Sequence, residues 1–135
     1  MRRLELKTQK RTQFIDITSK VAEAVRSSGV QDGFCYVFVP HTTAALTINE
    51  HADPSVARDL ELALERLAPW NGRYEHREGN SAAHIKASLL GSSQWVCVEN
   101  SRLQLGTWQG IFFCEFDGPR QRQVWIRLVN QAVDA

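Results

Sequence analysis

Eleven residues near the middle of the chain, HREGNSAAHIK beginning at His76, gather side chains that have chemical uses. If a helix begins at Asn80 or Ser81, its free backbone N–H groups favour an anion, and His84 lies one turn further along. Glu78 precedes the expected helix. The segment therefore predicts an oxyanion or phosphate site beside two imidazoles and a carboxylate.

A capped amphipathic helix with a wet polar face would give the same pattern. Asn80, His84 and Ser88 recur at four-residue intervals and share one helical face. The opposite face would carry the apolar residues Ala82, Ile85 and Leu89. Because the spacing of the two histidines matches no recognised zinc pattern, this segment alone favours the plain helix.

A second polar cluster, PHTTAALTINEHAD, changes that balance. Its polar side chains are His41, Thr42, Thr43, Asn49, Glu50 and Asp53. Together with the histidines at 76 and 84, the imidazole at 41 would suit a divalent ion that keeps an open position for water or substrate. Without a metal, the same groups would act as general acids and bases near neutral pH. Spacing does not decide between the two chemistries.

A third stretch, RLQLGTWQGIFFCEFDGPR, adds a carboxylate and an arginine. Glu115 shares the strand parity of Ile111, so it either faces water at a sheet edge or is buried with a partner and becomes a candidate base. Arg120 follows the tight turn and is suited to bidentate contact with a phosphate. We expect Arg122 and Arg127 on a solvated face.

Composition bounds the possible functions. The 135 residues are 43% hydrophobic and 23% charged, which is typical of one globular domain, 1–135. Sixteen basic against fifteen acidic residues give no reason to expect nucleic acid as a partner.

The three cysteines and the hydropathy pattern bear on location. Cys35, Cys97 and Cys114 each lie in an apolar run without a CxxC pair, so we expect small buried hydrophobes in a reducing compartment. The N-terminus has no apolar signal region, and no run approaches the roughly 20 residues of a membrane helix. We therefore expect a cytoplasmic protein without a membrane partner.

Period and turn residues predict the elements that must position these groups. Strands are expected at 2–9, 12–18, 33–40, 42–49, 94–99, 106–116 and 123–129. Helices are expected between Thr18 and Gly29, over 53–67 with Asp53 as N-cap, and over 80–91.

This order predicts a particular fold class. Two strands, a helix, two strands, helices and three strands indicate an α+β fold, with 42–49 as the antiparallel partner of 33–40. Because the strands are apolar on both parities, we expect two packed sheets. One sheet is buried against other subunits, or the strands form the centre of a monomeric core; the sequence leaves both open.

Taken together, the segments PHTTAALTINEHADPSV, HREGNSAAHIKASLLG and LGTWQGIFFCEFDGPR resemble the YjbQ-like family over most of residues 38–120. The resemblance implies two packed, mostly antiparallel sheets with helices, in a homotrimer whose sheets meet at the threefold axis. It also implies a pocket that holds a divalent metal (zinc or magnesium) or an anion. His51 stands where family members commonly have asparagine, so we leave it out of the site.

Site residues are assigned by matching the three segments, and Lys86 is added because its positive charge could neutralise a phosphate. The expected catalytic residues are His41, Thr43, Asn49, Asp53, Glu78, His84 and Glu115. The expected substrate- or phosphate-binding residues are Asn80, Ser81, Lys86, Thr107, Trp108, Gln109 and Arg120. The expected metal ligands are His41, His76 and His84.

The activity that the resemblance implies is a secondary thiamine-phosphate synthase. It joins hydroxymethylpyrimidine diphosphate to hydroxyethylthiazole phosphate and releases pyrophosphate, so the site must neutralise phosphate charge and exclude water. The nucleophile needs no deprotonation, and the acid and base groups exceed what the reaction requires. We therefore expect a phosphorylated small molecule as substrate, with a metal-assisted hydrolase using Glu115 or Glu78 as base, or a non-catalytic trimeric binding module, as alternatives.

Overall fold

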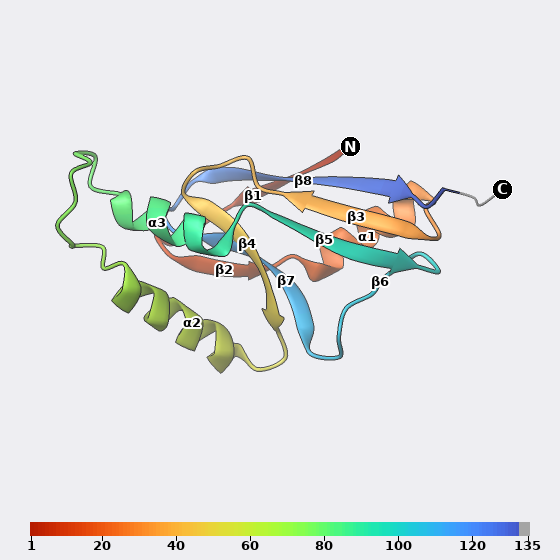
Figure 1. Cartoon of the computed structure of the whole chain (residues 1–135), viewed down its shortest axis with the longest axis horizontal. Helices are drawn as coiled ribbons and strands as arrows, with labels where there is room; N and C mark the ends of the chain where they lie inside the picture. The colour runs from red at the N-terminus through yellow and green to blue at the C-terminus, as the bar shows by residue number, and fades with distance from the viewer. Residues whose placement is uncertain (133–135) are drawn as a thin grey trace.

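The computed structural model describes residues 1–132. Its strands are β1 (Arg2–Lys7), β2 (Gln13–Asp16), β3 (Gly33–Phe38), β4 (Ala44–Glu50), β5 (Ser93–Glu99), β6 (Arg102–Leu103), β7 (Gln109–Glu115) and β8 (Gln121–Asn130). Its helices are α1 (Thr18–Ser28), α2 (Pro54–Leu67) and α3 (Ser81–Leu90), as Figure 1 shows. The α+β class is confirmed, and the short strand β6 was not predicted.

The strands form two sheets. One has the order β1-β8-β3-β5-β6 and the other β2-β7-β4, and all the pairings in both are antiparallel. Two packed antiparallel sheets are thus confirmed, but the predicted pairing of 33–40 with 42–49 is wrong. β3 pairs with β5 and β8, whereas β4 pairs with β7. The segment between β3 and β4 contains Pro40 and no Asn-Gly type turn, so the chain passes to the other sheet instead of closing a hairpin.

Three connections between the sheets lie at the same end of the molecule. They are residues 8–12, 39–43 and 116–120, and backbone hydrogen bonds join them, including Gly118 N to Arg11 O at 3.0 Å and Phe116 N to Thr43 O at 3.2 Å. A side chain at Gly118 would lie 2.2 Å from the carbonyl oxygen of Lys10, so only glycine permits this close approach.

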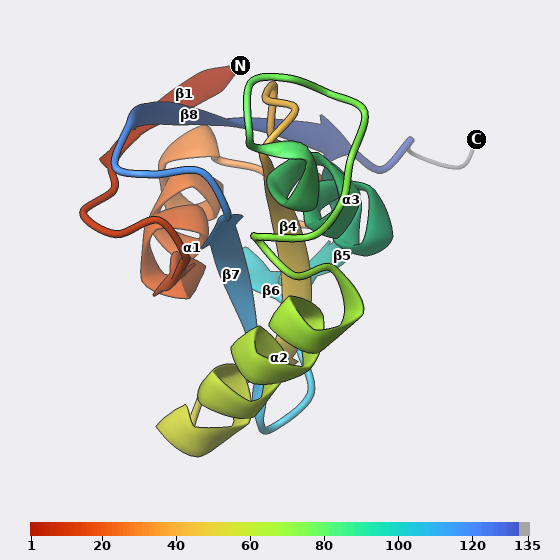
Figure 2. The same cartoon turned by 90° about the vertical axis from the view of Figure 1, so that its left-hand side faces the viewer.

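Two apolar layers hold the fold together. The first fills the space between the sheets and α1, with Val25, Val37, Phe113 and Ile126 among its buried residues. The second lies between the far face of the three-stranded sheet and the helices α2 and α3. Figure 2 shows α1 on one side of β7 and the other two helices on the opposite side.

The two later helices follow the prediction to different degrees. α2 begins after Asp53, whose side chain accepts a hydrogen bond from Ser55 N at 2.9 Å, as expected of an N-cap. For α3 the predicted apolar face is wrong, because Ile85 and Leu89 are exposed. Its buried residues are Ala82, Ala83, Lys86 and Ala87. The alanines let the helix lie close to the small sheet.

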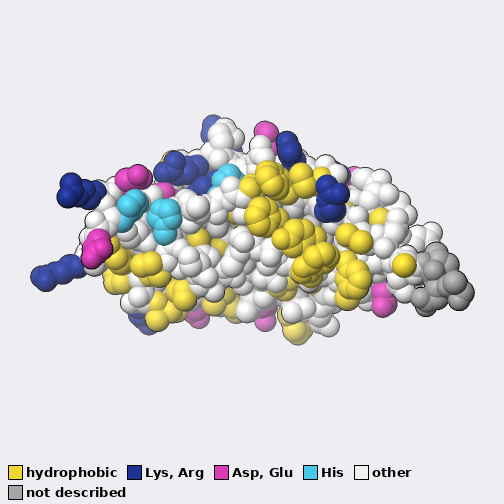
Figure 3. All heavy atoms as spheres, turned by 45° about the horizontal axis from the view of Figure 1, so that its top comes forward, with side chains coloured by type: hydrophobic (Ala, Val, Ile, Leu, Met, Phe, Trp, Pro, Cys, Tyr) yellow, Lys and Arg dark blue, Asp and Glu magenta, His cyan; other side chains and the backbone are white. Residues whose placement is uncertain are grey.

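The outer face of the five-stranded sheet carries an aromatic patch. It consists of Phe34, Tyr36, Phe38, Trp95 and Trp125, with ring centroids of Tyr36 and Trp95 4.6 Å apart. Phe34 and Trp95 are 44% and 60% exposed. Figure 3 shows hydrophobic side chains gathered over one area of the surface, with histidines beside it. An exposed patch of this kind is typical of an interaction surface.

The three cysteines differ in burial. Cys35 and Cys114 are buried as predicted, but Cys97 is exposed because β5 turns it to the outer face of the sheet. Burial raises the pKa of the Cys35 thiol to about 11. None of the helices in residues 1–132 combines the length and the apolar character needed to cross a membrane.

Candidate functional site

The strongest candidate site is a cavity of about 540 Å³ beside the connections that follow β3 and β7. We call it the His41 pocket. Its polar lining residues are His41, Thr42, Thr43, Glu78, Asn80, His84, Ser92, Asp117, Arg120 and Arg122. The volume lies within the range of small-molecule sites. Each of the three polar segments predicted from the sequence therefore contributes residues to this one cavity.

Glu115 and Arg122 form the buried base of the site. Glu115 is fully buried, and its carboxylate accepts hydrogen bonds from Nε and Nη2 of Arg122, from Thr8 Oγ1 and from two backbone N–H groups. Arg122 Nη2 also donates to Thr43 Oγ1 at 2.8 Å. Of the two alternatives left open for Glu115, the structure shows the buried carboxylate with a partner. Because its oxygens are already engaged, Glu115 is placed as a structural anion rather than a free base.

Arg122 corrects the expectation of a solvated residue. Its side chain is only 6% exposed, and it shares strand parity with Val124 and Ile126, which are buried between the sheets. Nη1 of Arg122 donates no hydrogen bond to any of residues 1–132, although this side chain lines the pocket. Glu115 and Thr43 thus fix the guanidinium through Nε and Nη2, and the N–H groups of Nη1 remain available to a ligand.

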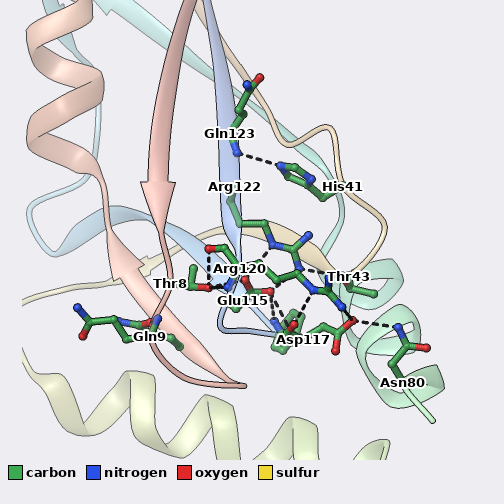
Figure 4. Close-up of polar contacts among 12 residues, drawn as sticks. Thr8, Gln9, His41, Thr43, Asn80, Glu115, Asp117, Arg120, Arg122 and Gln123 are labelled. Atoms are coloured by element: carbon green, nitrogen blue, oxygen red, sulfur yellow. Dashed lines mark hydrogen bonds and ion pairs between the residues drawn. The ribbon is translucent and has the colours of Figure 1, made fainter. Parts of the chain in front are cut away.

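His41 lies on the same wall, as Figure 4 shows. The backbone N–H of Gln123 donates to Nε2 of His41 over 2.9 Å. Desolvation lowers the pKa of His41, and the nearby charge of Arg122 lowers it further, against the smaller opposing effect of Glu115. The neutral imidazole is therefore the favoured form.

Asp117, Asn80 and Arg120 form the opposite wall. Asn80 Nδ2 and Arg120 Nη2 both donate to Asp117 Oδ2, at 2.9 and 3.0 Å. Asn80 is the N-cap residue of α3 but makes no capping hydrogen bond, and its Oδ1 is buried without a partner among the described residues. The predicted anion position at the start of α3 thus has the Asp117 carboxylate beside it, with Arg120 within reach of a ligand.

The expected metal ligands do not converge as a triad. The rings of His76 and His84 are 5.5 Å apart between centroids, and His76 Nε2 lies 3.9 Å from Glu78 Oε1. His41 uses Nε2 as an acceptor for Gln123. Across residues 1–132, no three His, Cys, Asp or Glu side chains are grouped so that they could hold a metal ion. In this arrangement the residues do not fit the expected zinc or magnesium, which stays a prediction.

Lys86 corrects the phosphate-binding set. Its side chain is buried, and Nζ donates to Glu65 Oε1 at 2.6 Å, so it joins α3 to α2 instead of facing a ligand. The sequence pattern missed this because a lysine on the buried side of a helix is recognisable only when its partner on the other helix is known. Ser81 lines a neighbouring hollow together with His76 and His84.

The remaining predicted residues lie at the far end of the small sheet. They are Asn49, Asp53, Thr107, Trp108 and Gln109. Strand β7 separates Gln109 from Glu115, and at about 3.3 Å per residue this places them roughly 20 Å apart. Within one chain they do not share a small ligand with His41. Asp53 caps α2, and Gln109 Oε1 accepts from Gly106 N at 2.7 Å.

The sequence reasoning missed one polar pair at this far end. His51 Nδ1 lies 2.8 Å from Asp16 Oδ2, and Asp16 also accepts from the hydroxyl and N–H of Thr18. Gly110 leaves room for the imidazole, since a side chain there would lie 2.4 Å from the His51 ring. The pair joins the β2–α1 junction to the end of β4, and only the tertiary fold reveals it.

Comparisons with known proteins place this geometry in a family. The family model described as "UPF0047 protein YjbQ-like" matches residues 2–131. The chain belongs to the YjbQ-like UPF0047 family. A curated relative, YugU of Bacillus subtilis, is 48% identical over 131 residues, covering 96% of this chain and 99% of its own length. The protein MJ1081 of Methanocaldococcus jannaschii is 49% identical over 126 residues, covering 93% of this chain and 91% of its own.

Solved structures share the YjbQ-like fold. A crystal structure of a YjbQ/UPF0047 protein from Clostridium acetobutylicum has a TM-score of 0.94 and 56% identity, covering 96% of this chain and 100% of its own. A YjbQ-like protein of unknown function from Sulfolobus solfataricus has a TM-score of 0.93 at 31% identity, covering 96% of each chain. These names state no activity.

Proposed function

We propose that the protein is an enzyme that binds the phosphoryl group of a small molecule in the His41 pocket. One observation carries the proposal: Arg120, Arg122 and His41 converge on one cavity, while Glu115 and Asp117 hold the two arginines in place. Arginine offers paired N–H groups that match phosphate oxygens, and fixed donors stabilise charge that develops on a leaving phosphate.

The reaction proposed is the one that the family resemblance names. Formation of thiamine phosphate requires pyrophosphate to leave the pyrimidine, and Arg120 and Arg122 would neutralise its charge. Thr43 supports this role by accepting from Arg122, so the guanidinium is fixed at two places. His84 lines the pocket and two neighbouring hollows, which gives room for a second substrate beside the first.

A metal-assisted hydrolase has less support. That reaction needs a free carboxylate base, and Glu115 is fully engaged, whereas Glu78 is largely exposed to solvent at 76% of its side chain. The non-catalytic module differs from the enzyme in turnover alone, so the experiment below separates the two.

We also propose that three copies assemble through the aromatic patch on the five-stranded sheet. The patch supports this because Phe34 and Trp95 would lose their contact with water in an assembly. In a trimer, the residues around Trp108, at the far end of the small sheet of one copy, could approach the His41 pocket of the next copy.

The test is incubation of the purified protein with both thiamine precursors, followed by chromatography for thiamine phosphate and pyrophosphate. Arg120→Met should abolish most turnover, because it removes a donor to the phosphate. The fold should stay intact, because the Arg120 side chain is exposed. Arg102→Met, on β6, is the matched control and should keep full activity. Saturable pyrophosphate binding without product would favour the binding module. If Arg120→Met changed neither turnover nor pyrophosphate binding, the proposed site would be refuted.

A further inference from the structure

We infer that His41 serves its pocket as an uncharged hydrogen-bond donor, with its proton on Nδ1, and acts neither as a general base nor as a metal ligand. The inference rests on the proposed function in one respect, that a phosphoryl oxygen occupies the pocket. The assignment of the proton rests on geometry alone.

The contact with Gln123 fixes the tautomer. Gln123 N donates to Nε2 over 2.9 Å, and a nitrogen that accepts an N–H carries a lone pair and no proton. The ring then holds its single proton on Nδ1. Protonation of Nε2 would set two N–H donors against each other, so the imidazolium form would have to break this contact.

The strand pattern explains why this contact is strong. Pairing between β3 and β8 ends at Phe38 and Trp125, and Gln123 lies two residues beyond that pair. Its N–H would be left without a strand partner, and partly buried backbone donors require one. Pro40 and the passage of the chain to the other sheet bring the His41 ring to the place where a strand carbonyl would otherwise be.

The charges around the ring favour the same state. The charge of Arg122 opposes a positive charge on the ring, and its partner Glu115 compensates only in part. The other ionisable groups that line the pocket are Glu78, His84, Asp117 and Arg120. Nδ1–H of His41 and Nη1 of Arg122 are therefore two donors on one wall of the pocket (Figure 4). The His41 ring is fixed by Gln123 N, and the Arg122 guanidinium is fixed by Glu115.

Such a pair would bind an oxyanion without taking up a proton. The two donors would hold one phosphoryl oxygen, and Arg120 would contact the others from the opposite wall. His41 would then fix the orientation of the phosphate, and any acid–base step would fall to another group, such as His84, the second imidazole that lines the pocket.

Two substitutions test the donor role with inorganic pyrophosphate as the probe in calorimetry. His41→Asn places an amide where Nδ1 lies and keeps a donor toward the pocket, so the affinity should stay within about threefold. His41→Gln places its amide where Nε2 lies and loses that donor, so binding should weaken about tenfold, or roughly 1.4 kcal/mol. Equal binding by His41→Gln and the wild type would overturn the inference.

Nitrogen-15 spectra of histidine-labelled wild-type protein test the tautomer without any substitution. His41 should show a protonated Nδ1 and an unprotonated Nε2 at pH 7, and Arg120→Met should leave this signature unchanged while it weakens pyrophosphate binding. A protonated Nε2 overturns the inference and leaves the proposed function standing. If the wild type binds no pyrophosphate at all, the proposed function fails and the donor role fails with it.

Discussion

Glu115 at the end of β7 and Arg122 near the start of β8 face each other between the two sheets, although their strands belong to different sheets. The turn that joins the strands is short, so the two side chains come together from opposite layers. Both residues are buried, and Arg122 also lines the His41 pocket.

Breaking this pair from one side should be costly. We expect Glu115→Gln or Arg122→Met to lower the free energy of unfolding by about 3–5 kcal/mol, because each leaves a buried charge without its partner. The double substitution should cost less than the sum of the two single ones. Urea unfolding followed by fluorescence measures all three, and additive losses would show that the residues do not act as a pair.

Lys86 should matter for stability and not for ligands. Glu65→Gln leaves the buried Lys86 ammonium without its carboxylate and should cost about 1–3 kcal/mol. Lys86→Met replaces the charge with an apolar side chain of similar length, so it should be tolerated better and should leave pyrophosphate affinity unchanged. A marked loss of affinity in Lys86→Met, with the fold intact, would restore this lysine to the site.

The shifted pKa of His41 predicts how stability depends on pH. Its pKa in the folded state lies below the unfolded value of 6.5, so the unfolded chain binds more protons as the pH falls through this range. Stability from His41 is present above pH 6.5 and decreases as the pH falls below it. Asp16, Asp53 and Glu65 have lowered pKa values in the folded state. The stability that these carboxylates contribute is lost only in more acid solution, below about pH 4.5.

Urea midpoints at pH 7.5, 6.5 and 5.5 measure this dependence. The wild type should lose stability across the series, and His41→Asn, which cannot titrate, should lose less. Parallel curves for the two proteins would show that the His41 ring does not carry the effect.

The aromatic patch predicts an assembly that a single charge disrupts. Trp95→Glu should convert a trimer into monomers in light scattering, because the interface would bury an unpaired carboxylate. Leu67→Glu, at an apolar residue on α2 that is also exposed, is the control and should leave the mass unchanged. A wild-type mass of one chain would refute the trimer.

Periodicity and capping residues predicted the element types well, because these signals are local. Asp53 illustrates this, since its carboxylate needs only Ser55 two residues away to form the cap. Pairing partners are not local. The passage of the chain from β3 to the other sheet, and the buried partners of Lys86 and Arg122, depend on segments that are distant in sequence.

Site residues could be predicted from the sequence where the type of side chain alone indicates its chemical role. His41, Thr43, Asn80, His84 and Arg120 line one pocket as the sequence led us to expect. Arg122 carried a usable signal that we did not weigh, because it alternates with the buried Val124 and Ile126. Trp108 was grouped with Glu115 because both occur in one motif, although a straight strand keeps them apart.

The pocket lies beside residues 39–43 and 116–120, which cross between the layers and supply part of its wall together with Arg122 of β8 and residues at the start of α3. Those walls are therefore anchored to both sheets at once. A slide of one layer against the other by a fraction of an ångström would change the spacing of the donors before it disturbed the apolar interior. We therefore expect ligand affinity at the proposed site to depend on the alignment of the two sheets.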